Sequence, residues 1–380
     1  MLKRLFVTAF AGLVGLMPGL AQAELLAMAN YESAPGETPR KEGIAVLDID
    51  PGSPTYKQIL VDMPLPADLV AHHIFYNPQA TKAYVTALGR SELRVMDMTR
   101  YPYRTKVVAV PGCEILEDVA FSRKLGRWYL TCMGTSNVVV GDAETDEVID
   151  SIAMPKPWPH GISVRDDIDR IVVTSTVKPD LSAAGEHVIV LRASTNEVLS
   201  VHKTSTKPSP SGAAPVEVFF VPGANPPVAY ITNMNEGTLW TATWQPETET
   251  FAFAQVEDVT RLGQGMPLEV YFNEAADRAF VTTAKPGHLS VYDISDPAAP
   301  RHLSAVPTAA GAHHLVFSAD GRYAFVQNSL LNLEGLSDGS ISVVDLETGT
   351  KVDSIETFKK AGLRPNMIVL LPEFGGGHTH

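Results

Sequence analysis

The chain has 380 residues, two cysteines and a formal net charge of −13 at pH 7. An acidic chain repels nucleic acid and anionic membrane surfaces, so we expect neither as a partner. After the first 23 residues, no stretch approaches the roughly 18 consecutive apolar residues that a membrane span needs. The composition therefore predicts a soluble protein without a membrane span, whose acidic surface suits cationic partners or metal ions.

Residues 1–23 have the pattern of a secretory signal peptide. Lys3 and Arg4 form a short basic start, an apolar stretch follows, and Ala-Gln-Ala at 21–23 is a small-x-small cleavage site. We therefore expect a mature chain that starts at Glu24 and is exported, with the bacterial periplasm as its compartment. In that oxidising compartment a disulfide is the expected state of the two cysteines, and thiolate ligation of a metal is the alternative.

One unit recurs along the chain every 43 to 56 residues. It consists of a strand, a polar turn and a second strand that ends in Thr, Ser or Asn. The copies read HHIFYNPQATKAYVTA from 72, EDVAFSRKLGRWYLTC from 117, HGISVRDDIDRIVVTS from 160, VEVFFVPGANPPVAYITN from 216, LEVYFNEAADRAFVTT from 268 and HHLVFSADGRYAFVQN from 313. Most are followed by a third strand, an acidic turn and a fourth strand. Four short antiparallel strands per repeat predict the blade of a β-propeller.

The two ends of the chain complete each other. Residues near 25–64 supply three strands without a first strand, and NMIVLLPE from 366 supplies a first strand without a partner. Joining them makes a seventh blade and removes the exposed sheet edges of an open ring. The sequence therefore predicts an all-β, seven-bladed propeller, closed by N- and C-terminal strands, with residues 24–380 as a single domain.

The second strands KAYVTA, VAYITN, RAFVTT and RYAFVQN resemble those of the YVTN-type seven-bladed propellers over essentially the whole mature chain. A looser likeness links the chain to selenium-binding-protein and methanethiol-oxidase propellers, which carry histidines where inner strands begin. The resemblance implies the fold. It does not imply one activity, because the superfamily includes lactonases, redox enzymes, metal-site proteins and scaffolds.

Histidines and carboxylates recur where the seven first strands begin. The first strand of a blade lines the central channel, so these positions gather around one mouth. The first position holds His72, Glu117, His160, Val216, Leu268, His313 and Asn366, and the second holds His73, Asp118, Gly161, Glu217, Glu269, His314 and Met367. Five of the chain's eleven histidines fall in these fourteen positions.

Imidazole nitrogens and carboxylate oxygens that converge from separate strands suit a copper or zinc ion. We therefore predict a metal site at the channel mouth. Its ligands are His72, His73, His160, His313 and His314, with Glu117, Asp118, Glu217 and Glu269 as further ligands or orienting partners. Because neighbouring residues on a strand point to opposite sides, one histidine of each pair is expected to orient the site without touching the ion.

The sequence leaves three functions open. The first is a copper-dependent oxidoreductase acting on a small molecule. The second is a non-enzymatic periplasmic protein that binds metal, delivers it to a protein partner or serves as a scaffold. The third is a lactonase-like hydrolase, since GAHHLVFSADGRYAFVQN from 311 also resembles lactonase-type propellers, although their usual arginine is missing. A polar, water-filled channel is the alternative to any site, and the histidine-containing tail, with His378 and His380, is left without a role.

Overall fold

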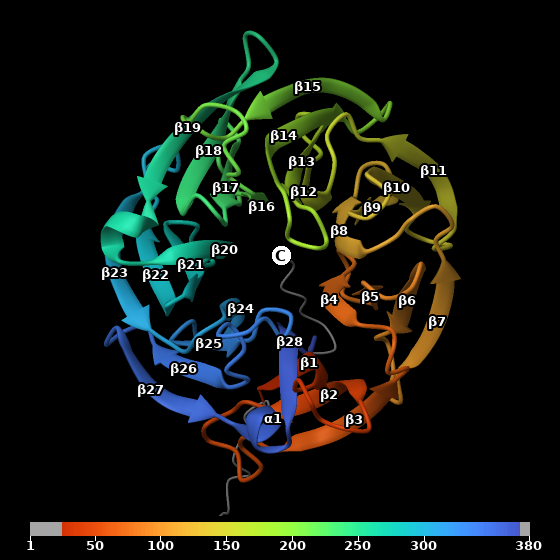
Figure 1. The fold of residues 1–380 in the computed structure, drawn as a ribbon, viewed down its shortest axis with the longest axis vertical. Helices are drawn as coiled ribbons and strands as arrows, with labels where there is room; N and C mark the ends of the chain where they lie inside the picture. The colour runs from red at the N-terminus through yellow and green to blue at the C-terminus, as the bar shows by residue number, and fades with distance from the viewer. Residues whose placement is uncertain (1–24, 373–380) are drawn as a thin grey trace, which may run out of the picture.

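The computed structural model describes residues 25–372, which form seven four-stranded antiparallel sheets arranged in a ring (Figure 1). The predicted all-β, seven-bladed propeller is confirmed. The predicted signal peptide and the tail histidines His378 and His380 lie outside the described residues.

The blades are numbered here in chain order, each given from its innermost to its outermost strand. Blade 1 contains β4 (Ala71–Tyr76), β5 (Lys82–Ala87), β6 (Glu92–Asp97) and β7 (Arg104–Ala109). Blade 2 contains β8 (Leu116–Ser122), β9 (Arg127–Cys132), β10 (Asn137–Asp142) and β11 (Val148–Ala153). Blade 3 contains β12 (Pro159–Arg165), β13 (Arg170–Val177), β14 (Ala184–Arg192) and β15 (Glu197–Lys203).

The remaining blades follow the same order. Blade 4 contains β16 (Pro215–Phe220), β17 (Val228–Asn233), β18 (Thr238–Gln245) and β19 (Thr250–Asp258). Blade 5 contains β20 (Gly265–Phe272), β21 (Arg278–Lys285), β22 (Gly287–Asp293) and β23 (Arg301–Pro307). Blade 6 contains β24 (Ala312–Phe317), β25 (Tyr323–Asn328), β26 (Ile341–Asp345) and β27 (Thr350–Ile355). Blade 7 contains β28 (Leu363–Leu370), β1 (Leu26–Ser33), β2 (Glu42–Asp48) and β3 (Ile59–Leu65).

Two short helical segments interrupt the strands, η1 (Val259–Leu262) and α1 (Thr357–Lys360). Each has four residues, and between residues 25 and 372 no helix has the length and apolar character needed to cross a membrane.

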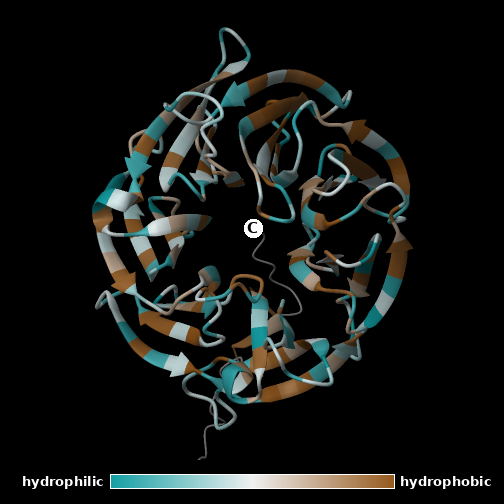
Figure 2. Cartoon of the chain, in the orientation of Figure 1, coloured by the Kyte–Doolittle hydropathy of each residue, from teal (hydrophilic) through white to brown (hydrophobic). Residues whose placement is uncertain are grey.

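The burial of each strand follows from its place in the blade. Outer strands are the most exposed: β3 alternates in exposure, whereas β7 is exposed at five of its six positions. Figure 2 shows hydrophilic and hydrophobic segments along the rim of the ring. Middle strands such as β5 are buried along nearly their whole length, because neighbouring blades cover both faces. The apolar cores accordingly lie between blades: one cluster joins Val316 and Phe325 of blade 6 to Ala29 and Ile368 of blade 7.

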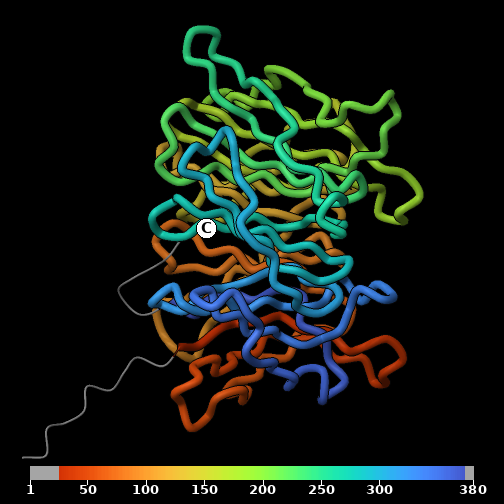
Figure 3. Tube along the Cα trace, turned by 90° about the vertical axis from the view of Figure 1, so that its left-hand side faces the viewer, coloured from red at the N-terminus to blue at the C-terminus, as the bar shows by residue number. Residues whose placement is uncertain are grey.

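Blade 7 closes the ring by pairing the two ends of the described chain. Strand β28 runs antiparallel to β1, with Met28 opposite Val369 and Ala29 opposite Ile368. Figure 3 shows the red N-terminal and blue C-terminal strands side by side. The Nζ of Lys57 lies 2.7 Å from the Asp353 carboxylate, which ties blade 7 to the outer strand of blade 6. The predicted closure by strands near 25–64 and 366–373 is confirmed.

The start of the inner strand carries the same irregularity in blades 1 to 6. In blade 1, Ala71 pairs with Ala87 and Ile74 with Val85, so His72 and His73 together lie opposite the single residue Thr86. Equivalent register shifts occur in the other five blades. Two residues facing one is a β-bulge, which bends the strand and redirects its side chains.

Candidate metal centre

The bulges bring both histidines of each pair to the same side of the strand. The rings of His72 and His73 stack with centroids 3.7 Å apart, and those of His313 and His314 lie 3.9 Å apart. The assumed alternation of neighbouring residues to opposite sides was wrong for these pairs, whereas the prediction that one member of each pair orients the site stays a prediction. Regular strand alternation does not apply within a bulge, because the extra residue breaks the period of two.

Backbone strain marks the same strand starts. Two positions before the first of the paired residues, the backbone adopts a positive φ in all six bulged blades, from 50° at Val70 to 84° at Gly311. The other four residues are Ile115, Trp158, Ala214 and Met266. Five of the six have a side chain, so the left-handed conformation costs on the order of 1 kcal/mol or more at each. The ring therefore keeps a costly geometry at the positions that aim side chains into the channel.

The nine predicted site residues come together in the channel and are almost closed to solvent. His72, His73, Glu117, Asp118, Glu217, Glu269, His313 and His314 are all buried. The side chain of His160 is the most accessible of the five histidines, at 13% exposure. This burial argues against an open, water-filled mouth around these groups.

Three histidines form an all-nitrogen cluster. His73, His313 and His314 each offer one ring nitrogen, and these nitrogens lie within 4.8 Å of one another. His73 comes from blade 1 and the other two from blade 6, the two blades that flank blade 7. Nitrogens at this spacing can surround one metal ion.

Carboxylates contact the other ring nitrogens of this cluster. The Oδ1 atom of Asp118 lies 2.8 Å from Nδ1 of His73, and Oε1 of Glu269 lies 3.3 Å from Nε2 of His313. The remaining nitrogens, Nε2 of His73 and Nδ1 of His313, are buried and make no hydrogen bond within the described chain. A carboxylate at one nitrogen and an unsatisfied second nitrogen is the arrangement of metal-ligating histidines.

Two further clusters combine imidazole with carboxylate, and they share His160. One contains His72, Glu117 and His160, and the other contains Asp118, His160 and Glu217. Oε2 of Glu117 lies 3.0 Å from Nε2 of His72 and 3.5 Å from Nε2 of His160. Nδ1 of His160 is 2.9 Å from Oε1 of Glu217. Neighbouring blades thus alternate histidine and carboxylate around half of the ring.

Burial sets the charge of the central imidazole. It lowers the pKa of His73 well below that of a free histidine, and the adjacent His72 lowers it further. Only a neutral imidazole has a lone pair for a metal ion, so this shift favours the ligating form of His73.

The carboxylates respond differently to the same environment. Burial raises the pKa of Glu217 well above its usual range, and the nearby charges of Asp118 and Glu269 add to the effect. Burial also raises the pKa of Asp118. It acts in the same direction on Glu117, but His160 and His72 outweigh it, so the pKa of Glu117 is lowered. The ionised form of each carboxylate is therefore favoured only where a nearby histidine offsets burial and the other negative charges.

Buried threonines hold the strand starts in place, and the site prediction did not include them. The hydroxyl of Thr131 accepts a hydrogen bond from the Asp118 N–H at 2.9 Å and donates to the His160 carbonyl of the next blade at 2.6 Å. Equivalent residues accept from the second paired position in four other blades: Thr86, Thr232, Thr282 and Gln327. The Thr near the end of most second strands, replaced by Gln327 in blade 6, was the available sequence signal.

A tyrosine also contacts the site without having been predicted. The Tyr271 hydroxyl lies 3.3 Å from Nδ1 of His314 and accepts the Leu315 N–H at 3.3 Å. It follows Glu269 by two positions on β20, so one strand supplies two groups to the histidine pair of blade 6.

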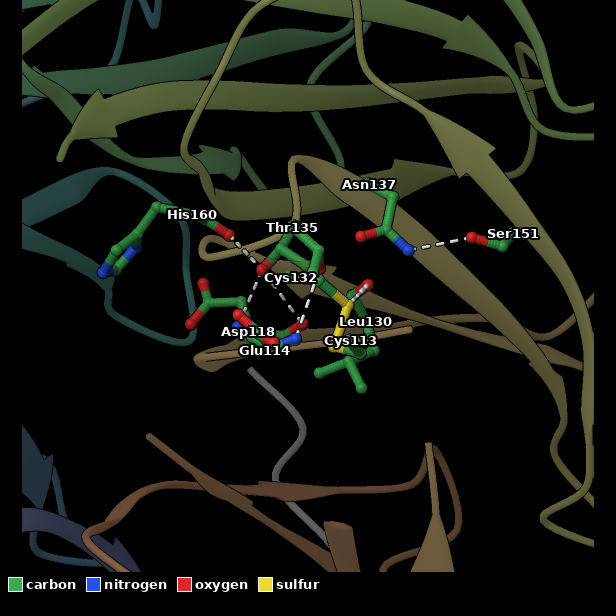
Figure 4. Close-up of a disulfide and its surroundings, with 10 residues drawn as sticks. Cys113, Glu114, Asp118, Leu130, Cys132, Thr135, Asn137, Ser151 and His160 are labelled. Carbon is green, nitrogen blue, oxygen red and sulfur yellow. Dashed lines mark hydrogen bonds between the residues drawn. A yellow bond between two sulfur atoms is a disulfide. The ribbon is translucent and has the colours of Figure 1, made fainter. Parts of the chain in front are cut away.

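Cys113 and Cys132 form the predicted disulfide, with an S–S distance of 1.98 Å. Both residues are fully buried in an apolar cluster between blades 1 and 2, which includes Leu93 and Leu130. Figure 4 shows the disulfide near Asp118, with the His160 ring directed away from it. Because both sulfurs are consumed in the bridge, the thiolate-ligand alternative does not hold in this state.

Comparisons with known proteins establish the fold and leave the activity open. No protein-family model matches the chain, and no curated protein sequence matches it. A solved structure of a hypothetical selenium-binding protein from Sulfolobus tokodaii is similar, with a TM-score of 0.74 and 14% identity over 94% of this chain and 96% of that one. The identity is low enough that the likeness concerns the fold alone.

Two other solved structures share the architecture. A putative 6-phosphogluconolactonase from Bacteroides uniformis is 10% identical over 92% of this chain and 100% of that one, with a TM-score of 0.64. Hydrazine synthase from Kuenenia stuttgartiensis is 13% identical over 74% of this chain and 79% of that one, with a TM-score of 0.55. The chain is therefore a seven-bladed propeller similar to selenium-binding and lactonase-like propellers, with buried clusters that can hold a metal ion.

Proposed function

We propose that this chain is an exported, copper-dependent oxidoreductase that acts on a small molecule. The single observation that carries the proposal is the cluster of His73, His313 and His314, in which a carboxylate contacts one nitrogen of His73 and of His313. The other nitrogen of both rings is buried without a hydrogen bond in the described chain. Leaving such groups unsatisfied costs about 1–3 kcal/mol each, which a bound ion offsets.

Three imidazoles favour copper or zinc and leave a further coordination position open. Copper binds nitrogen sites most tightly among the divalent first-row metals, and it adds one-electron chemistry that zinc lacks. The residues of this chain would hold the ion, fix the imidazole orientations through Asp118 and Glu269, and exclude water through burial. The depth of the site favours a resident ion over one that is handed to a partner protein.

Residues 1–23 support export, because their basic start, apolar stretch and cleavage site are those of a signal peptide. The names of structurally similar proteins suggest which compounds to test first. One is called a selenium-binding protein and another a hydrazine synthase, so small selenium, sulfur and nitrogen compounds are the first candidates.

The test is metal analysis of the full chain, secreted to the periplasm with copper and zinc supplied and without an affinity tag. We expect bound copper, a cupric spectrum with nitrogen ligands, and turnover of a small sulfur or selenium compound with dioxygen or an added electron acceptor as oxidant. His313→Ala should lose the ion, whereas His288→Ala, outside the site, should retain it.

Other outcomes overturn the proposal in distinct ways. Bound metal that transfers to a partner apoprotein, without turnover, would indicate a delivery protein. Lactone hydrolysis that survives exhaustive chelation would indicate a metal-independent hydrolase. If the protein binds neither copper nor zinc at micromolar concentration, the histidines have a structural role.

A further inference from the structure

The ligand groups in the channel divide into two sets with no member in common. The first set is the all-nitrogen cluster of His73, His313 and His314. The second consists of the two mixed clusters, which contain His72, Glu117, Asp118, His160 and Glu217. An ion in the first set therefore uses none of the ligands of the second.

Charge balance calls for more than one divalent ion. Four carboxylates, Glu117, Asp118, Glu217 and Glu269, are at least 95% buried. Their ion-pair partners in the described part of the chain are all histidines, with no lysine or arginine among them. When all four carboxylates are ionised and the imidazoles are neutral and ligating, one divalent ion leaves two negative charges uncompensated, and two divalent ions balance all four. Buried charges without compensation are strongly unfavourable.

The second set also contains unsatisfied atoms. Both carboxylate oxygens of Glu217 are buried; Oε1 lies 2.9 Å from Nδ1 of His160, and the other close polar group is a second acid, Asp118. Nδ1 of His72 is likewise buried and makes no hydrogen bond within the described residues. Buried polar atoms in this state are unfavourable, and a bound ion nearby would offset the cost.

The separations in the second set are those of ligands around one ion. The distances from Glu117 to His72 and to His160 are 3.0 Å and 3.5 Å. Ligand atoms of a tetrahedral ion at about 2.1 Å stand roughly 3.4 Å apart. His72, Glu117 and His160 can therefore close on an ion with only small side-chain movements.

We propose that the channel is a two-ion centre, in which the mixed set around His160 binds a second divalent ion. The proposal rests on the proposed function for its first ion only. Its ligands would be His72, Glu117 and Nε2 of His160, whereas Glu217 contacts Nδ1 on the other side of the His160 ring and orients it. Two imidazoles and a carboxylate suit zinc, manganese or ferrous iron better than a soft cuprous ion. Asp118 links the two sites, because it belongs to the second set and contacts His73 of the first. Filling one site therefore changes the electrostatic environment of the other.

The test is the stoichiometry of zinc bound by the full, metal-stripped chain, measured by titration calorimetry and by elemental analysis after gel filtration. His378 and His380 are both replaced by alanine so that the count reports the channel. We expect two zinc ions per chain. Glu217→Gln should retain the ion of the first set and lose the second, or weaken it by about 10- to 100-fold. His313→Ala should show the reverse, and His288→Ala should retain both.

The outcomes separate this inference from the proposed function. One zinc ion per wild-type chain overturns the two-ion centre and leaves the single-ion proposal standing. No bound zinc also overturns the two-ion centre, and the proposed function falls with it only if copper does not bind either. Loss of both ions in either variant, with circular dichroism and thermal unfolding as in the wild type, shows one indivisible cluster and also overturns the inference. If Glu217→Gln does not fold, Glu117→Gln replaces it, with the same single loss expected.

Discussion

The Asp118 carboxylate lies 2.8 Å from Nδ1 of His73, although the two residues come from neighbouring blades. The contact holds one nitrogen of the imidazole and leaves the other for an ion in the channel. It also means that a residue of blade 2 sets the orientation of a ligand in blade 1. The predictions below test this site and the scaffold that carries it.

Replacing Asp118 by Asn keeps the shape of the side chain and removes its charge. We expect metal affinity at His73 to fall by about 10- to 100-fold, because loss of an orienting carboxylate typically has that effect. Competition titration against a chelator measures the affinity. Glu114→Gln, an exposed carboxylate near the same strand start, is the control and should leave affinity unchanged. Equal affinities for wild type and Asp118→Asn would show that this contact does not position His73.

Replacing Glu217 by Gln should stabilise the metal-free protein at neutral and alkaline pH. Burial, with the charges of Asp118 and Glu269, raises the pKa of Glu217 in the folded state. Its contribution to stability is complete below the unfolded-state pKa, about 4.3, and is lost as the pH rises through the folded-state value. Gln cannot ionise and keeps that stability, so the gain over wild type should grow with pH. Urea unfolding in excess chelator between about pH 4 and pH 9 measures it. A variant less stable than wild type throughout this range would contradict the prediction.

Replacing Thr131 by Val removes the hydroxyl between blades 2 and 3. Two buried backbone groups, the Asp118 N–H and the His160 carbonyl, lose this partner, so we expect a loss of about 1–3 kcal/mol in the free energy of unfolding. The shift in the denaturant midpoint measures the loss, provided that the dependence of the unfolding free energy on denaturant concentration is unchanged. Thr135→Val is the matched control, because Thr135 accepts only an exposed N–H from Glu114. A Thr131 variant as stable as this control would show that the hydroxyl is dispensable.

Replacing both Cys113 and Cys132 by Ala should lower stability without changing the amount of metal bound. The bridge closes a loop with a sequence separation of 19, for which chain entropy predicts about 3 kcal/mol. Thermal unfolding and elemental analysis of the same samples test the two parts. A double variant that is as stable as the wild type but binds less metal would support the alternative that the cysteines are metal ligands.

Deleting residues 364–380 should abolish cooperative unfolding. The deletion removes nearly all of β28, which is the inner strand of blade 7 and the only partner of β1 on that side. The exposed edge of β1 would also invite aggregation. Calorimetry compares the truncated and full chains, and a cooperative transition at the wild-type temperature would mean that closure by β28 is unnecessary.

The sequence by itself determined the architecture, because strand alternation and repeat spacing are local properties of the chain. The period of two places apolar residues between blades, and the recurrence of the unit predicts six full blades and a seventh made from both ends. The same alignment placed His72, His160 and His313 in one position of the repeat, which was enough to predict that they meet.

Only the tertiary structure decided how the site is built. The bulge opposite Thr86 turns His72 and His73 to one side, and nothing in the local pattern distinguishes this from regular alternation. Which carboxylate contacts which imidazole depends on the angle between blades, so the pairing of Asp118 with His73, and the division of the ligands into two sets, could not be read from the repeat. A repeat specifies which residues share a position, whereas contacts across a channel depend on distances that arise only when the ring closes.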